Sequence, residues 1–491
     1  MTSSPTLLPL RIGDRRVTHG EDDDHTIIVR SPYDRRELGR VPAGTEDDLD
    51  AAVAEAAARH REGPLEQWQR AEILDRVAAR LAEPETAARF ARSIADEAAK
   101  PMKTARTEVQ RAADTFRFAA GAARSMTGEQ VPLDASNAAS GSGKLGFVLR
   151  TPSGVVAAIS PFNFPLNLVA HKIAPAIAAG CPVVLKPAST TPLTALGLAE
   201  LVDDCGLPPG WLNVVTCSGK VADHLVTHPD VRLITFTGSP GVGWAIAEKA
   251  ARKHVGLELG NNAPLIIEPD ADLETVAAKV SVAGFSHAGQ SCISVQRVYV
   301  HESVADAFLA ALVPKVEALK VGDPLDDDTD VSALITSGDT DRVRQMITAA
   351  VDGGASVACG GVVDDHGVLA PTVLTGVTPD MEVCATEVFG PVIGVASYTD
   401  FDEALRLASD TRYGLQAGVF TNDLTKALHA ARTLDFGGVL VNEVPTWRAD
   451  QMPYGGVRDS GNTREGPAYA IEEMTERRLV VLQPGSQQSR L

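Results

Sequence analysis

The sequence predicts an α/β protein with two parallel-sheet lobes and a small β flap. Three observations lead to this fold class. The chain has 491 residues, which is too long for one ordinary hydrophobic core. Short apolar strands alternate with helices in two successive series, as they do in parallel sheets. Two further extended segments belong to neither series, and an apolar edge strand usually needs a partner.

The first third of the chain alternates polar turns with alanine-rich helices that we expect to form covering layers. Thr45 is placed to cap a helix that starts with the acidic residues 46–48, and Pro84 suits the first turn of another helix. Apolar residues recur at helical spacing over 104–123, which predicts a further helix there.

The first strand–helix series begins at Val155. Its predicted strands are VVAAIS, PVVLKP, WLNVVT and RLITFTGS, and helices are predicted after Pro165 and Pro192, around Val221 and after Gly241. We therefore expect the first lobe to comprise residues 1–132 and 153–259.

The second series begins near Pro264 with PLIIE. A long helix to His287, the strand QRVYV and a helix up to Lys320 are expected next, and the series runs to about Asn442. The second lobe is thus predicted to span 260–442. The flap is predicted from 133–152 and 470–487, and its tail includes the apolar run RRLVVL, which suggests that it mediates oligomerisation.

Composition restricts the partners of the chain. A formal net charge of −19 argues against a nucleic-acid surface, which needs clustered Lys and Arg. The start MTSSPTLLPLRIGDRR has no apolar leader and no window reaches the length of a membrane span, so we expect a cytoplasmic protein without a membrane partner. The acidic runs 21–24 and 326–328 lack calcium-loop spacing, and no metal is expected. Six cysteines without CxxC spacing indicate reduced thiols.

One of these cysteines stands out by its neighbours. Cys292 lies in the small-residue turn HAGQSCIS, where a thiol could face a cleft, although a lone cysteine is most often buried filler. The same chain carries further short motifs in order: SPFNFP, LKPAST, FTGSPGVG, GLELGNNAP, TEVFGPV and MPYGGVRDSG. With these motifs from about Val41 to Arg477, the chain resembles the aldehyde dehydrogenase superfamily, which uses NAD or NADP. Its two lobes would then be Rossmann-type, the first binding the dinucleotide and the second carrying the catalytic cysteine.

The resemblance implies a catalytic set of three residues. Cys292 would attack the aldehyde, because a thiolate adds directly to the carbonyl and later leaves a thioester that water can cleave. The side-chain amide of Asn163 and the backbone N–H of Cys292 would bind the resulting oxyanion. Glu258 would act as the general base. Taken alone, Asn163 reads as a turn residue between two prolines and Glu258 as a solvated carboxylate beside a glycine turn.

Cofactor residues are also implied by the resemblance. GSPGVG would place a helix N-terminus near the pyrophosphate, Lys186 would bind the adenosine ribose, and Glu387 the nicotinamide ribose. Many NAD-specific relatives carry a glutamate where Ser189 stands, so NADP should be tolerated and could be preferred. The full expected set is Ser160, Phe162, Lys186, Ser189, Gly238, Ser239, Gly243, Leu259, Glu387 and Phe389.

The substrate pocket implied by the resemblance contains two arginines. Its expected lining is Arg111, Phe164, Leu168, His171, Ser291, Ile293 and Arg448. Relatives that oxidise apolar aldehydes carry an aromatic residue in place of Arg448, so a guanidinium there favours a polar or anionic tail. The plainer interpretation is a solvated loop arginine or a structural ion pair.

The motifs look most like the bacterial branch of lactaldehyde, phosphonoacetaldehyde and non-phosphorylating glyceraldehyde-3-phosphate dehydrogenases. We therefore expect oxidation of a short polar aldehyde to a carboxylic acid by a homodimer or homotetramer. A CoA-acylating semialdehyde dehydrogenase is the first alternative, which Glu258 disfavours, because that branch usually lacks a glutamate there. A non-catalytic relative with the same fold is the second alternative.

Overall fold

The structure is a computed structural model, and it describes residues 7–19, 25–137, 141–250 and 252–483. The acidic run at 21–24, the expected flap residues 138–140 and 484–487, and the expected first-lobe residues 1–6, 20 and 251 lie outside this part of the chain. No helix of the described residues is long and apolar enough to cross a membrane.

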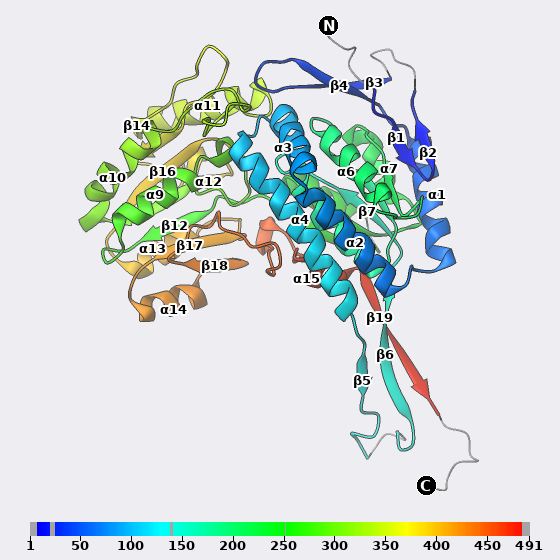
Figure 1. The fold of residues 1–491 in the computed structure, drawn as a ribbon. Coiled ribbons are helices and arrows are strands. Elements are labelled where there is room, and N and C mark those ends of the chain that lie inside the picture. The colour runs from blue at the N-terminus through cyan, green and yellow to red at the C-terminus, as the bar shows by residue number, and fades with distance from the viewer. Residues whose placement is uncertain (1–6, 20–24, 138–140, 251, 484–491) are drawn as a thin grey trace.

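The first sheet has seven strands and contains all four strands expected of the first series (Figure 1). In spatial order they are β11 (His254–Glu258), β10 (Val231–Thr237), β7 (Val155–Ile159), β8 (Val183–Lys186), β9 (Leu212–Val214), β1 (Leu10–Ile12) and β2 (Arg15–Val17). The strands from β11 to β9 are parallel, whereas β1 and β2 add an antiparallel edge. After β7 the chain adds β8 and β9 on one side of it. The strand order then reverses, and β10 and β11 are added on the other side of β7. Ligands bind at the carboxyl ends of strands beside such a reversal.

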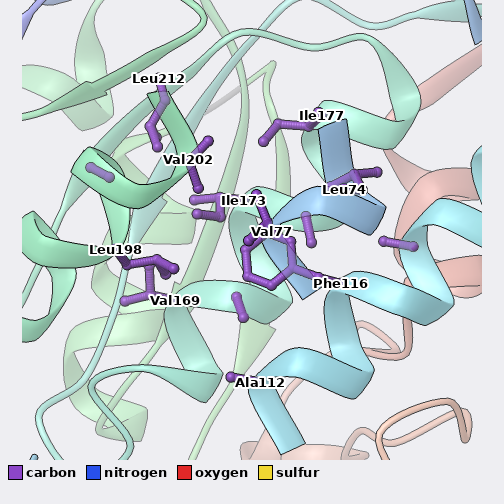
Figure 2. Close-up of a cluster of buried hydrophobic side chains, with 14 of the residues drawn as sticks. Leu74, Val77, Ala112, Phe116, Val169, Ile173, Ile177, Leu198, Val202 and Leu212 are labelled. Carbon is purple, nitrogen blue, oxygen red and sulfur yellow. The ribbon is translucent and has the colours of Figure 1, made fainter. Parts of the chain in front are cut away.

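Helices cover both faces of this sheet because its central strands are apolar on both sides. One face packs against α2 (Gln67–Ala82), α3 (Pro84–Ala98), α4 (Met102–Ser125), α5 (Asn167–Ala179) and α6 (Pro192–Asp204). The other face packs against α1 (Glu46–Glu62), α7 (Gly219–Thr227) and α8 (Pro240–Lys249). Figure 2 shows how Phe116 of α4 lies among side chains of α2, α5 and α6.

The expected helix starts in the first third are confirmed. Thr45 accepts a hydrogen bond from the backbone N–H of Asp48, whose carboxylate accepts one from the Thr45 N–H, so the two form a capping box for α1. Pro84 is the first residue of α3, where its missing N–H costs nothing. The predicted helix at 104–123 is α4, two residues longer at each end.

The second sheet also has seven strands, in the order β14 (Ser356–Cys359), β15 (Thr372–Thr375), β16 (Val392–Tyr398), β13 (Arg297–His301), β12 (Pro264–Ile267), β17 (Gln416–Phe420) and β18 (Gly438–Val441). Only β14 is antiparallel to its neighbour among these described strands. One face packs against α9 (Leu273–Ala283), α10 (Ala305–Glu317), α11 (Ser337–Asp352) and α12 (Glu382–Ala385), and the other against α13 (Phe401–Ser409) and α14 (Leu424–Thr433).

One helix of the second lobe is shorter than expected. The helix predicted to reach His287 ends at Ala283, and a 3₁₀ turn covers Ser286–Gly289. His287 and Ala288 both adopt left-handed backbone angles, with φ of 51° and 53°, and Gly289 follows at 71°. This reversal cannot continue an α-helix, because a helix needs negative φ throughout.

The flap is a three-stranded antiparallel sheet of β19 (Thr475–Leu482), β6 (Leu145–Pro152) and β5 (Glu129–Val131), which projects from the body in Figure 1. Its boundaries differ from the expected ones at two places. The third strand, β5, lies before residue 133, and residues 470–473 belong to α15 (Pro467–Glu473). A separate hairpin of β3 (Thr26–Arg30) and β4 (Glu37–Pro42) precedes α1.

Candidate active site

A cleft of about 480 Å³ lies between the two lobes. On one side it meets the carboxyl ends of β7, β8, β10 and β11, and on the other the segments that lead into the amino ends of β13 and β16. Its lining includes Ser160, Phe162, Asn163, Leu168, Lys186, Ser189, Gly238, Ser239, Glu258, Leu259, Cys292, Arg342, Glu387 and Phe389. The cleft therefore contains thirteen of the residues that the sequence predicted for catalysis, cofactor or substrate.

The first-lobe wall fits a dinucleotide. The hydroxyl of Ser160 is buried and has no hydrogen-bond partner among the described residues. The N-terminus of α8 opens at Ser239 and Pro240, next to Gly238, so its free N–H groups are placed to receive a phosphate. Gly243 does not line the cleft, but a Cβ there would lie 2.4 Å from Leu259, which packs against this helix.

The adenosine end of the cleft carries Lys186 and Ser189. Burial lowers the pKa of the Lys186 ammonium, and a thiol at Cys217 is its neighbour. The Ser189 hydroxyl donates a hydrogen bond of 3.1 Å to the carbonyl of Cys217. Among the described residues that line the cleft, the acidic side chains are Glu258 and Glu387, so Lys186 has no carboxylate beside it in the cleft.

The second-lobe wall presents Glu387 and Phe389. Glu387 accepts a hydrogen bond of 3.1 Å from the backbone N–H of Asn261, and burial raises the pKa of its carboxyl to about 7. A Cβ on Gly260 would lie 2.2 Å from the Glu387 carboxylate, so a glycine is needed there. Phe389 has a left-handed backbone and its ring makes an edge contact with Phe162, 5.9 Å between centres.

The turn before Cys292 aims the thiol at the cleft. A Cβ on Gly289 would lie 2.1 Å from the carbonyl oxygen of Gly390, so the left-handed turn packs directly against the second-lobe wall. The Cys292 sulfur lies 3.0 Å from the hydroxyl of Tyr454. Burial raises the pKa of the Cys292 thiol to about 12, so the thiol needs a base before it can attack.

Glu258 is the candidate base for the Cys292 thiol. It ends β11 and is buried, and neither carboxylate oxygen has a hydrogen-bond partner among the described residues. A Cβ on Gly455 would lie 2.7 Å from one of these oxygens, so the glycine leaves room for the side chain. Burial raises the pKa of Glu258 well above its usual value, and the nearby carboxylate of Glu465 adds to the effect. A carboxylate with a raised pKa is a stronger proton acceptor when ionised.

Asn163 is buried beside the cysteine turn. Its side-chain amide donates a hydrogen bond of 2.9 Å to the carbonyl of Gln290, two residues before Cys292. This contact holds the amide next to the Cys292 backbone, and the second N–H of the amide stays available to an oxyanion.

A network of charged side chains lies beside Glu258. Asp450 accepts two hydrogen bonds from Arg111, at 3.0 and 2.8 Å, and lies 3.0 Å from His171. Arg448 donates to Glu465 at 2.9 Å. Burial and Arg448 lower the pKa of His171, so its imidazole stays neutral. Both expected substrate arginines are therefore paired with a carboxylate.

The expected substrate residues thus divide into two groups. Leu168 lines the cleft, whereas six others lie beside it: Arg111, Phe164, His171, Ser291, Ile293 and Arg448. The Lys100 ammonium, which is buried, lies 3.5 Å from the centre of the Phe164 ring, and the centres of the Phe164 and His287 rings are 6.3 Å apart. Arg111 is the more open of the two arginines, with 26% of its side chain exposed against 5% for Arg448.

Four residues of the site were not predicted: Arg342, Asp450, Tyr454 and Glu465. Three of them, Asp450, Tyr454 and Glu465, lie between β18 and α15, in a segment of turns, isolated bridges and one short 3₁₀ helix. The motif MPYGGVRDSG did mark the neighbourhood of Tyr454. No sequence motif pointed to Arg342 as a site residue. It lies on α11, and its guanidinium donates a hydrogen bond to the carbonyl of Val388.

Comparison with known proteins agrees with this geometry. The model of the aldehyde dehydrogenase family matches residues 19–480. A 3-sulfolactaldehyde dehydrogenase of Priestia aryabhattai is 45% identical over 457 residues, 92% of this chain and 94% of the relative. The crystal structure of aldehyde dehydrogenase 21 from Physcomitrella patens, in complex with the reaction product succinate, is 38% identical with a TM-score of 0.93, over 99% of this chain and 100% of that one.

A third similar protein carries a cofactor. The glyceraldehyde-3-phosphate dehydrogenase of Methanocaldococcus jannaschii, complexed with NADP, is 38% identical with a TM-score of 0.89, over 94% of this chain and 100% of that one. Other structurally similar proteins are NADP complexes or NAD-dependent enzymes.

Proposed function

The chain belongs to the aldehyde dehydrogenase family and catalyses NAD(P)-dependent oxidation of an aldehyde to a carboxylic acid, and on that premise we propose its substrate class and the residues that act. The proposed substrate is a short polar aldehyde with an anionic group, such as a sulfonate, carboxylate or phosphonate. Cys292 is the proposed nucleophile, Glu258 the base and Asn163 the oxyanion donor.

The chemistry starts at the Cys292 thiol. Glu258 accepts the thiol proton, and the thiolate attacks the aldehyde carbon, so that negative charge moves to the carbonyl oxygen. The Asn163 amide and the Cys292 N–H donate to that oxygen. Glu387 and Phe389 would hold a nicotinamide cofactor, which supplies the hydride acceptor when bound; loss of the hydride would leave the acyl group on Cys292 as a thioester. Glu258 then accepts a proton from the water that cleaves the thioester, and the absence of a hydrogen-bond partner for its carboxylate within the described part of the chain supports this second use.

The proposal of an anionic substrate rests on the charged side chains around the cleft. Two guanidinium groups, Arg111 and Arg448, lie beside the cleft, each paired with a carboxylate, Asp450 and Glu465 respectively. A guanidinium has five N–H donors, so one that shares some of them with a carboxylate can still bind an anionic tail. Arg111 is the partly exposed member, so it is the group that such a tail would meet. Similarity to a 3-sulfolactaldehyde dehydrogenase supports the same class.

We further propose that NADP is accepted. Among the residues that the structure describes, Lys186 has no carboxylate neighbour in the cleft and the Ser189 hydroxyl is directed to the Cys217 carbonyl, so none of them places a negative charge against a 2′-phosphate there. Lys186 would pair with that phosphate, Glu387 would hold the nicotinamide ribose and Phe389 would back the ring.

Assembly into a homodimer or homotetramer through the flap is proposed from its exposed apolar residues. β19 and β6 expose Leu145, Leu149, Leu479, Val481 and Leu482. An exposed apolar strand pair of this kind favours burial against another chain. The six cysteines are free thiols, which supports a reducing compartment such as the cytoplasm.

A panel of aldehydes tests the substrate class. Short aldehydes with a sulfonate, carboxylate or phosphonate are compared with lactaldehyde, hexanal and benzaldehyde, each with NAD and NADP, by absorbance of the reduced nicotinamide. The anionic group should have the highest kcat/KM. A higher kcat/KM for lactaldehyde than for every anionic aldehyde would replace the proposal by a small neutral substrate.

A further inference from the structure

Tyr454 is the described side chain whose polar atom lies against the Cys292 sulfur. Its hydroxyl oxygen is 3.0 Å from Sγ, within the range of a hydrogen bond to sulfur. The side chain is 3% exposed, so water does not replace this contact.

Several independent contacts fix the Tyr454 ring. Its backbone carbonyl accepts a hydrogen bond of 2.6 Å from Glu465, and its N–H donates to Met452 at 2.8 Å. The guanidinium carbon of Arg448 lies 3.8 Å from the ring centre. Ile293 and Leu415 of the second lobe form one buried apolar cluster with Tyr454. The hydroxyl is therefore held at the sulfur by its surroundings and does not reach it by a chance rotamer.

The ionisation of the two groups decides which of them donates. With the thiol protonated, either atom can donate to the other. Once Cys292 has lost its proton, the sulfur is an acceptor only, and the phenol must donate. Burial keeps the pKa of Tyr454 well above its usual value, so the phenol retains its proton while the sulfur is charged.

We propose that Tyr454 is a catalytic residue: its hydroxyl donates a hydrogen bond to the Cys292 thiolate and raises the fraction of the sulfur that is ionised for attack. The proton leaves the sulfur for Glu258, and Tyr454 loses none. When the S–C bond forms, the negative charge passes from sulfur to the aldehyde oxygen, and the phenol remains neutral. Arg448 above the ring draws electron density from it and strengthens the O–H as a donor. This role rests on the proposed function of Cys292 as nucleophile.

The test is the pH dependence of Cys292 alkylation in the whole enzyme without aldehyde or cofactor. Iodoacetamide is added at several pH values between about 7 and 9, and the modified Cys292 peptide is followed by mass spectrometry, which separates it from the five buried cysteines. Well below the pKa of the thiol the alkylation rate follows the ionised fraction, so at each pH Tyr454→Phe should react about tenfold to a hundredfold more slowly, the effect of losing a hydrogen bond to a charged group. Tyr299→Phe is the matched control, because it removes a buried hydroxyl that donates to the carbonyl of Leu407 in the second lobe.

A second variant keeps the role testable if Tyr454→Phe does not fold. Replacing Tyr454 by 3,5-difluorotyrosine keeps the ring and makes the phenol a stronger donor, so Cys292 should be alkylated faster than in the wild type. An unchanged or higher rate in Tyr454→Phe, an equal loss of rate in Tyr299→Phe, or no gain with the fluorinated residue overturns the role. The measurement needs no turnover, so it is separate from the proposed function, which fails if Cys292→Ala still oxidises aldehydes.

Discussion

Arg448 donates a hydrogen bond to Glu465 at 2.9 Å, and both side chains are buried next to Glu258. Burial alone would oppose ionisation of Glu465, but the positive charges of Arg448 and Lys172 hold its pKa below the usual value. The charge that Glu465 keeps raises the pKa of Glu258. One ion pair thus tunes the residue proposed as the base.

Glu465→Gln should move the acidic limb of the pH profile to lower pH. Glu258 works as a base only when ionised, so activity falls as pH falls through its raised pKa. The substitution removes a negative neighbour and frees the charge of Arg448, and both changes favour the Glu258 carboxylate. The measurement is kcat/KM against pH. Glu443→Gln, which changes a partly exposed partner of Lys279, is the control. A limb that stays in place would assign it to another group.

Arg111→Ala should lower turnover of anionic aldehydes selectively. A charge-assisted hydrogen bond is worth about 1.5–3 kcal/mol, so kcat/KM for such substrates should fall about tenfold or more. Lactaldehyde and hexanal should be spared. The decisive quantity is the ratio of anionic to neutral efficiency, with Arg106→Ala as control, because Arg106 lies on the same helix and pairs with Asp327. An unchanged ratio would mean that Arg111 serves only Asp450.

Arg448→Phe should act mainly on stability. It leaves Glu465 buried without its closest partner, and breaking a buried pair costs about 3–5 kcal/mol. The thermal midpoint, measured by circular dichroism, should fall well below that of Arg111→Ala, whose guanidinium is more exposed. Equal midpoints in the two variants would contradict this assignment.

Ser189→Glu should shift the cofactor preference toward NAD. The new carboxylate would stand beside Lys186 in the cleft, where it repels a 2′-phosphate. The ratio of kcat/KM for NADP to that for NAD measures the change, and Ser189→Ala, which removes only the hydrogen bond to Cys217, should leave it nearly constant. If Glu and Ala give the same ratio, Ser189 does not face the adenosine ribose.

Glu258→Gln should slow turnover strongly and allow an acyl-enzyme to accumulate on Cys292. A neutral amide cannot accept the proton of the attacking water, although it fills the same space. Mass spectrometry after mixing with aldehyde and cofactor detects the acyl group, and Cys292→Ala should show none while still binding the cofactor. Wild-type rates in Glu258→Gln would assign the proton transfer elsewhere.

The sequence predicted the strands of the first series well because these depend on local pattern, and the cofactor residues that the family resemblance implied line one cleft. The runs at Val155 and Val183 are apolar strands by composition, and the residues after them reach the cleft by the geometry of a parallel sheet. It could not predict that Arg448 and Arg111 are paired, since their partners Glu465 and Asp450 meet them only in the folded chain. The end of α9 at Ala283 was missed although Gly284, a residue that often ends a helix, follows it directly. The left-handed turn beyond it packs against Gly390, a contact that exists only in the folded chain.

The cleft is shared by the two lobes: Ser160 and Lys186 come from the first, and Glu387 and Phe389 from the second. A dinucleotide that contacts all four has its full affinity only while both lobes are folded and in register. Its binding free energy therefore stabilises each lobe against separate opening, by an amount that grows with the logarithm of its concentration. In the presence of saturating cofactor, heat should unfold the two lobes as one cooperative unit, even though each has its own hydrophobic core.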